Sequence, residues 1–217
     1  MSQNKKFAPY SAFCRLDRDA RECLVARDLM FFLDANGVKA QVGDCAKVLR
    51  FFDSDEDGIL SYADFIQMIL PCDDNDLRAE VQRRPYSRIG RFDSLDVEIE
   101  NALALLLRHE IDLIKRVEGL VRDLQCSPDF TPHAAYRAVD RYEEGKITKE
   151  NLTDFFRQFG NYLSEAEVFS IIRRMDTDGD AKVSYEEFAD YLVNQVNEEA
   201  PLTKPPPQKS NGKKKKA

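Results

Sequence analysis

Apolar residues recur at helical spacing around four polar loops of twelve residues each. The residue four before each loop is apolar or aromatic, at Phe13, Leu49, Tyr136 and Ile172, and the residue just before it is apolar, at Leu16, Phe52, Val139 and Met175. Further apolar residues follow the loops, at Leu29, Phe65, Leu152 and Phe188. Positions three and four apart share one face of a helix, so each loop is predicted to lie between two amphipathic helices. The pattern predicts an all-α chain.

The loops form two pairs, and the members of each pair are 36 residues apart. The first pair spans 17–28 and 53–64, and the second spans 140–151 and 176–187. A repeat of this length indicates one structural unit used several times. We expect two lobes, 1–72 and 129–197, with a connector at 73–128 and a disordered tail rich in lysine and proline at 198–217.

The loop at 53–64 concentrates negative charge. Asp53, Asp55 and Asp57 occupy alternate positions, and Gly58 follows them directly. Like charges in one tight turn repel each other, so the loop favours a bound cation. Calcium takes six to eight oxygen ligands, and short carboxylates at every second residue of a turn converge on one point. The loop is therefore predicted to bind a divalent metal ion.

The repeated unit resembles the EF-hand, and the order of the four units resembles calmodulin. EF-hand loops take metal ligands from positions 1, 3, 5, 7, 9 and 12 and turn sharply at position 6. In the first metal loop the resemblance implies ligands at Asp53, Asp55, Asp57, the Ile59 carbonyl, Ser61 and Asp64. In the second it implies Asp176, Asp178, Asp180, the Lys182 carbonyl, Ser184 and Glu187. We expect two Ca²⁺ ions per chain.

Each predicted metal loop departs from the pattern at one position. Ala181 replaces the turn glycine. A left-handed backbone at a non-glycine residue costs roughly 1–2 kcal/mol, which weakens binding about 5- to 30-fold if the whole cost falls on the bound state. Asp64 stands where the family favours glutamate. Its shorter arm favours a single-oxygen contact and a lower coordination number, so we expect Mg²⁺ to compete with Ca²⁺ at 53–64.

The other two loops are degenerate and are expected to hold no metal. Loop 17–28 has Arg21 and Glu22 at positions 5 and 6, and loop 140–151 has Tyr142 and Asn151 at positions 3 and 12. Their eighth positions stay apolar, as do those of the metal loops: Leu24, Leu60, Ile147 and Val183. Since EF-hands pair through short β contacts, the resemblance implies that each degenerate hand supports a metal-binding one.

The connector carries a long apolar stripe. Steps of four and three residues join Ile99, Leu103, Leu106, Leu113, Val117, Leu120 and Leu124. This spacing predicts one helix over 93–125. The helix has three possible partners: a second copy in a coiled coil, a larger assembly, or the lobes of its own chain. Further apolar residues, among them Leu107 and Ile111, widen the face, which favours docking within the chain.

Charge and cysteine content narrow the possible partners. The net charge is −7. Residues 201–217 contribute six lysines and no acid, so residues 1–200 carry −13 (−7 minus 6). An acidic body repels nucleic acid, whereas the lysine tail is either a solubilising segment or a contact for a polyanion. Five scattered cysteines, Cys14, Cys23, Cys45, Cys72 and Cys126, are expected to be free thiols in a reducing compartment.

These features predict a calcium sensor or calcium-responsive regulatory protein with one dedicated protein partner, either an amphipathic helix or a cytoskeletal component. The alternative is a constitutive structural subunit of a ciliary or cytoskeletal assembly. We expect no enzyme, because His109 and His133 stand alone and no nucleophile motif is present. No stretch is long and apolar enough to span a membrane, so a cytoplasmic location is expected. The long insert between the lobes is similar to that of some protist and ciliate calcium-binding proteins.

Overall fold

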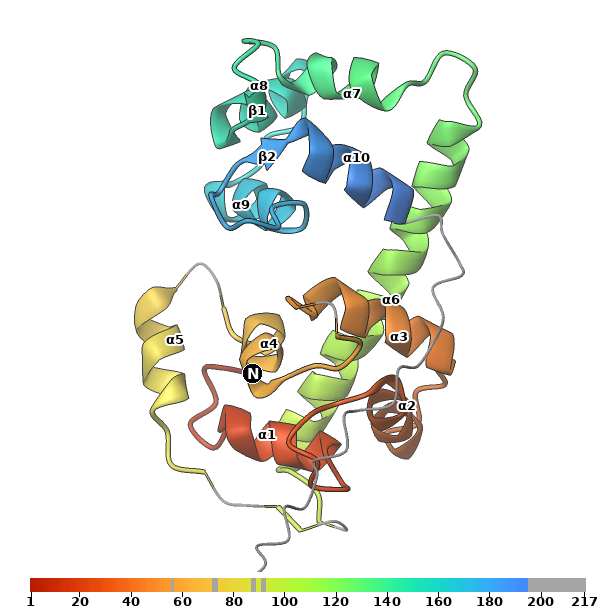
Figure 1. The fold of residues 1–217 in the computed structure, drawn as a ribbon. Coiled ribbons are helices and arrows are strands. Elements are labelled where there is room, and N and C mark those ends of the chain that lie inside the picture. Colours follow the sequence, from red (N-terminus) through yellow and green to blue (C-terminus); the bar gives the residue numbers. More distant parts are fainter. Residues whose placement is uncertain (56, 72–73, 87–88, 91–92, 195–217) are drawn as a thin grey trace, which may run out of the picture.

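The chain folds into two helical lobes along one long helix (Figure 1). The computed structural model describes residues 1–55, 57–71, 74–86, 89–90 and 93–194. The first lobe contains α1 (Pro9–Leu16), α2 (Ala26–Ala35), α3 (Val42–Phe52) and α4 (Tyr62–Ile69). The second contains α7 (Pro132–Val139), α8 (Lys149–Gln158), α9 (Glu165–Arg173) and α10 (Tyr185–Asn194). The predicted all-α class, with short β contacts between paired loops, is confirmed.

Within each lobe the two loops pair at their eighth positions. In the first lobe Leu24 and Leu60 exchange backbone hydrogen bonds of 2.9 Å in both directions. In the second lobe β1 (Lys146–Ile147) and β2 (Val183–Ser184) run antiparallel, with Ile147 opposite Val183. Each degenerate loop is thus joined by backbone hydrogen bonds to a predicted metal loop.

The predicted apolar positions form the cores of the lobes. The eighth loop positions are the most deeply buried set: Leu24, Leu60, Ile147 and Val183 are each at most 1% exposed. The positions four before each loop are at most 5% exposed, namely Phe13, Leu49, Tyr136 and Ile172. The spacing of apolar residues therefore identified the inward faces of the helices correctly.

The connector helix α6 (Val97–Gln125) begins four residues later than predicted. Asp96 is its N-cap, and the side chain accepts a hydrogen bond of 3.2 Å from the Glu98 amide. An aspartate in this position satisfies an amide that has no partner within the helix, so the helix starts after it. Asp93 consequently lies outside the helix.

The first half of α6 docks on the first lobe. Its buried side chains belong to the same apolar cluster as α1–α4: Ile99, Leu103, Ala104, Leu107, Ile111 and Ile114. The predicted stripe is wrong in the second half, because Leu113, Leu120 and Leu124 are 37%, 66% and 43% exposed. Apolar residues cover two neighbouring faces of this helix, and the shape of the lobe decides which face is buried.

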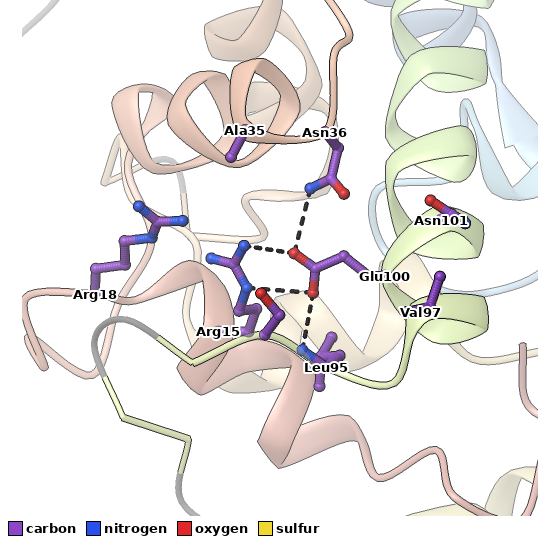
Figure 2. A pocket seen from close by; sticks show the side chains of 9 residues that line it. Arg15, Arg18, Ala35, Asn36, Leu95, Val97, Glu100 and Asn101 are labelled. Carbon is purple, nitrogen blue, oxygen red and sulfur yellow. Dashed lines mark hydrogen bonds and ion pairs between the residues drawn. The ribbon is translucent and has the colours of Figure 1, made fainter.

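A buried ion pair joins the start of α6 to α1. Arg15 donates to Glu100 at 2.5 and 3.2 Å, and the two side chains are 5% and 9% exposed. Glu100 also accepts from Asn36 at 3.3 Å and from the Leu95 amide at 3.0 Å (Figure 2). A buried charge is tolerated when it is paired and fully hydrogen-bonded, as this carboxylate is.

Two further ion pairs join α6 to α3. Lys47 contacts Glu118 at 2.7 Å, and Lys115 contacts Asp44 at 2.7 Å. Together with the Arg15–Glu100 pair, they fix the connector helix against the first lobe near both ends of the docked half.

Helix α5 (Asn75–Gln82) was not predicted. The segment is polar, but Asp74 caps it through the Leu77 amide at 2.8 Å, and Val81 is fully buried in the core of the first lobe. The apolar cluster therefore continues past residue 72 into the connector.

Among the described residues, Cys14, Cys23, Cys45 and Cys126 lie outside any disulfide. Cys72 and the tail at 198–217 lie outside the described residues. Within the described ranges, no helix combines the length and the apolar composition that a bilayer crossing requires.

Candidate metal centres

Three carboxylates converge in the loop at 53–64. One ligand oxygen from each of Asp53, Asp55 and Asp57 lies within 4.8 Å of the other two. Asp53 follows α3 directly as its C-cap, while Asp55 and Asp57 are exposed. The sequence prediction that these three residues come together is confirmed by this geometry.

Asp53 has a buried oxygen that suits a cation. Its Oδ2 accepts from the Gly58 amide at 2.8 Å. Its Oδ1 has no hydrogen-bond partner among the described residues, although it is buried. Burial raises the pKa of Asp53, the Gly58 amide lowers it, and Asp55 and Asp57 raise it again. An unpaired buried carboxylate oxygen is costly, and a divalent cation between the three carboxylates would remove that cost.

Asp64 is held apart from this trio. Its carboxylate accepts from the Ser54 hydroxyl at 2.6 Å, and from the amide and hydroxyl of Ser61 at 3.0 and 2.5 Å. Burial raises the pKa of Asp64, but these hydrogen bonds outweigh it and lower the pKa overall. The carboxylate is therefore ionised and oriented, as a metal ligand must be, and Ser61 lies beside it.

The loop at 176–187 forms a second trio. Ligand oxygens of Asp176, Asp178 and Glu187 lie within 4.8 Å of one another. Glu187 Oε1 accepts from the amide and hydroxyl of Thr177 at 2.8 and 2.9 Å, and Oε2 accepts from the amide and hydroxyl of Ser184, both at 2.8 Å. These bonds outweigh the effect of burial and lower the pKa of Glu187 to about 2. The carboxylate at position 12 is thus ionised, and both of its oxygens are fixed in direction.

Asp180 does not join the second trio. It forms an ion pair with Lys146 of β1 and also accepts from the Lys182 amide at 2.9 Å. The hydrogen bond from Lys146 lowers the pKa of Asp180. Sequence reasoning missed Lys146, because nothing within the loop 176–187 points to a residue 34 positions away. The pairing of the two loops brings it there.

Position 6 adopts the left-handed backbone in all four loops. The φ angles are +61° at Glu22, +82° at Gly58, +76° at Gly145 and +61° at Ala181. Each of these amides donates to the aspartate at position 1, at distances of 2.7, 2.8, 2.9 and 2.8 Å respectively. The predicted left-handed conformation at Ala181 is confirmed, and it serves this hydrogen bond.

In each of the two degenerate loops a side chain of the loop donates to a carboxylate at position 1 or 12. In loop 17–28, Arg21 Nη2 donates to both oxygens of Asp28 at 2.6 and 2.7 Å. In loop 140–151, Asn151 Nδ2 donates to Asp140 Oδ1 at 3.2 Å. Each contact joins two side chains at positions that an EF-hand uses for metal ligands, 5 and 12 in the first loop and 12 and 1 in the second.

The comparisons with protein families agree with this architecture. Models of the EF-hand domain pair match residues 133–193 and residues 28–70. These two matches cover the second lobe and most of the first, including both predicted metal loops.

Two individual relatives are similar over most of the chain, and a third is similar over a shorter segment. It is 25% identical to troponin C from Tachypleus tridentatus over 155 residues, which is 71% of this chain and 94% of the relative. It is 20% identical to centrin-3 from Homo sapiens over 196 residues, which is 90% of this chain and 87% of the relative. It is 33% identical to calmodulin-like protein 2 from Arabidopsis thaliana over 63 residues, which is 29% of this chain and 41% of the relative.

These relatives do not test the narrower likeness to ciliate proteins, which stays a prediction. The oxygen donors suit calcium, because each trio joins the carboxylates of loop positions 1 and 3 to a third carboxylate, at position 5 in the first loop and position 12 in the second. The chain is therefore a calmodulin-like EF-hand protein built from two EF-hand domain pairs, and calcium is its metal ion.

Proposed function

We propose that this protein binds two calcium ions, one in loop 53–64 and one in loop 176–187, through the twelve ligands predicted above. The observation that carries the proposal is the convergence of two carboxylate trios, each within 4.8 Å, in loops that are paired and flanked by helices. Position 7 contributes carbonyls from Ile59 and Lys182. Magnesium competes at 53–64, because the shorter side chain of Asp64 lies outside the first trio.

The proposed role is that of a calcium-responsive regulatory protein with a dedicated protein partner. In a sensor EF-hand, ion binding changes the angle between the two helices and exposes an apolar groove. The first lobe already holds α6 against its apolar cluster. Calcium at 53–64 would therefore change the fit of α6 on that lobe rather than admit a foreign helix.

The second lobe offers a surface to a partner. Phe159, Tyr162 and Phe169 are 67%, 81% and 42% exposed there. Large exposed aromatic side chains are typical of protein contact surfaces. Aromatic rather than methionine side chains favour one dedicated partner over many, since methionine is the more adaptable residue.

A constitutive structural subunit of a ciliary or cytoskeletal assembly is the second proposed function. The internal donors Arg21 and Asn151 favour it, because they close two of the four loops without an ion. Either role places the protein in the cytoplasm, in contact with protein and without catalytic activity of its own. The lysine tail, which lies outside the described residues, would add a contact to a polyanion.

Calorimetry on the full chain tests the proposal. We expect two calcium ions per chain, and one in each of the variants Asp55→Ala and Asp178→Ala, whose side chains are exposed and whose loss should leave the fold intact. An apolar dye then separates the two roles. A sensor increases dye binding at micromolar calcium, whereas a constitutive subunit does not. No calcium uptake at millimolar concentration would refute the two proposed metal sites and the sensor role.

A further inference from the structure

The two lobes meet where the entering helices of the two metal-binding hands end. Arg174 is the C-cap of α9, and its guanidinium donates to both carboxylate oxygens of Glu110 on α6, at 3.0 and 3.4 Å. The same guanidinium lies over the ring of Phe51 on α3, with Cζ 4.8 Å from the ring centroid. One side chain of the second lobe thus contacts both the connector helix and the first lobe.

The preceding residue makes a separate contact with the first lobe. Arg173 donates to the backbone oxygen of Gln67 at 2.9 Å and to its side-chain oxygen at 3.2 Å. Gln67 lies on α4, and its side chain also accepts from Arg78 of α5 at 2.8 Å. We call the contacts of Arg173 and Arg174 with Gln67, Phe51 and Glu110 the arginine bridge.

The arginine bridge spans both helices of the first metal hand. Phe51 belongs to the entering helix α3, two residues before Asp53, and Gln67 belongs to the exiting helix α4, three residues after Asp64. Because Arg173 and Arg174 are adjacent, one short segment of the second lobe contacts both helices of this hand. A change in the angle between α3 and α4 therefore strains the bridge.

The arginine bridge also lies next to the second metal loop along the chain. Arg174 precedes Asp176 by two residues, so it lies at the end of the helix that enters loop 176–187. Arg174 and Glu110 are 25% and 16% exposed. A partly buried, two-oxygen ion pair with a ring stacked on it is more rigid than a surface pair.

We propose that the arginine bridge couples the two calcium sites, so that an ion bound in either loop raises the affinity of the other. This inference rests on the proposed function, since it needs both loops to bind calcium. An ion fixes the helices around its own loop, and the bridge extends that order to the other lobe, which then loses less freedom when it binds. Coupling between sites is reciprocal and commonly reaches a factor of five or more.

Calcium titrations of six full-length proteins test the coupling. They are the chain itself, Asp55→Ala, Asp178→Ala, and the same three with Arg174→Met. With Arg174 present, we expect each remaining site to bind about fivefold more weakly when the other loop is silenced than when it is loaded. With Arg174→Met, we expect this ratio to fall to about one for both sites.

Arg157→Met is the matched control. Arg157 lies in the second lobe, is exposed, and pairs with Asp154 within its own helix. The substitution Arg157→Met removes the same charge from the second lobe without touching the first lobe, so the fivefold ratio should persist. Glu110→Gln provides a second test if Arg174→Met lowers stability, because it removes the ion pair while keeping the side-chain volume. The exchange Glu110→Arg with Arg174→Glu should restore part of the coupling.

The possible results separate the two proposals. If both loops bind calcium but the ratio is one in the intact chain, or stays fivefold in both Arg174→Met and Glu110→Gln, the bridge does not couple the sites and only this inference fails. If neither loop binds calcium, the proposed function fails as well.

Discussion

Arg21 and Asp28 place an internal cation in the first degenerate loop, with the guanidinium 2.6 and 2.7 Å from the two carboxylate oxygens. Asp28 occupies position 12, where an EF-hand that binds metal would present its last ligand. The same carboxylate accepts from the Val25 amide at 2.8 Å. The charged side chain that disrupts the metal pattern therefore replaces the metal in holding the loop together.

Removing this internal cation is expected to destabilise the first lobe. Arg21→Met keeps an apolar stem but leaves Asp28, which is 7% exposed, without its charged partner. Because Arg21 itself is 37% exposed, the expected loss at neutral pH is about 1–2 kcal/mol, below that for a fully buried pair. Urea unfolding measures it, and Arg27→Met, an exposed arginine on the same helix as Asp28, is the control.

The loss of stability caused by Arg21→Met should shrink as the pH is lowered. Burial raises the pKa of Asp28, while the Val25 amide and Arg21 lower it. Without Arg21 the folded pKa rises further above the unfolded value, so the folded state binds more protons than the unfolded state between those two values. Stability is then lost as pH rises through the folded pKa and regained as pH falls. A deficit that grows at acidic pH would contradict this account.

The turn residue should set the affinity of each metal loop. Ala181 has a φ of +61°, whereas glycine reaches this region freely. Ala181→Gly is expected to strengthen calcium binding at 176–187 about fivefold, or about 1 kcal/mol. Gly58→Ala should weaken loop 53–64 by a similar factor. A Cβ at Gly58 would meet no atom within 4 Å, so backbone strain alone would cause the loss.

Each turn variant is best titrated with the other loop silenced, in the Asp55→Ala or Asp178→Ala background, so that one site is observed at a time. Equal affinities before and after both substitutions would show that the left-handed turn does not limit binding.

Lys146 is expected to compete with calcium for Asp180. The lysine comes from the paired loop, and its hydrogen bond to Asp180 lowers the pKa of that carboxyl while Asp180 raises the pKa of Lys146. Lys146→Met should release Asp180 to the ion and strengthen binding at 176–187 by roughly two- to fivefold, a small gain because the pair is exposed to solvent. Lys149→Met, an exposed lysine at the start of α8, is the control. Unchanged or weaker binding in the Lys146 variant alone would refute the competition.

Local patterns predicted the parts of this fold that local residues determine. Phe13, Leu24 and Leu29 lie at fixed distances from one loop, and their counterparts around the other three loops are buried in the same way, except for Phe188, which is partly buried. Asp53, Asp55 and Asp57 converge because one short turn brings them together. Neither result needs information from elsewhere in the chain.

Contacts between distant segments were not predictable in this way. Leu113 and Leu120 continue the apolar stripe of α6 but are exposed, because the first lobe selects the neighbouring face that carries Leu107 and Ile111. Helix α5 has a single fully buried residue, Val81, too weak a pattern to identify a helix. From the sequence, Arg21 indicates only a departure from the metal-binding pattern. The signal for an internal ion pair is Asp28, seven residues later.

Cys45 should be the least reactive of the described thiols. It is fully buried, and burial raises its pKa to about 11. Since only the thiolate reacts with iodoacetamide, little of Cys45 is reactive at neutral pH. Mass spectrometry after brief alkylation should find exposed Cys126 modified and Cys45 intact, with Cys45 modified only after denaturation. Equal labelling of both in the native protein would contradict the buried position.

The side chain at position 12 is expected to set the preference between calcium and magnesium. The shorter Asp64 lies outside the first trio, whereas the longer Glu187 reaches into the second trio, although both carboxylates accept hydrogen bonds from hydroxyls at loop positions 2 and 9. Asp64→Glu adds the missing methylene, so both carboxylate oxygens can reach the ion and raise its coordination number. Calcium accepts seven or eight oxygens and magnesium only six, so the added ligand favours calcium.

We therefore expect Asp64→Glu to reduce, roughly tenfold, the effect of millimolar magnesium on calcium binding at 53–64, a change of about 1.4 kcal/mol in selectivity. The reciprocal change Glu187→Asp should make loop 176–187 sensitive to magnesium by shortening its arm. Titrations with and without magnesium measure both, and thermal melting checks that the buried position 64 accepts the larger side chain. If the Asp64→Glu variant melts like the parent and its magnesium sensitivity is unaltered, the length of this side chain does not decide the choice of ion.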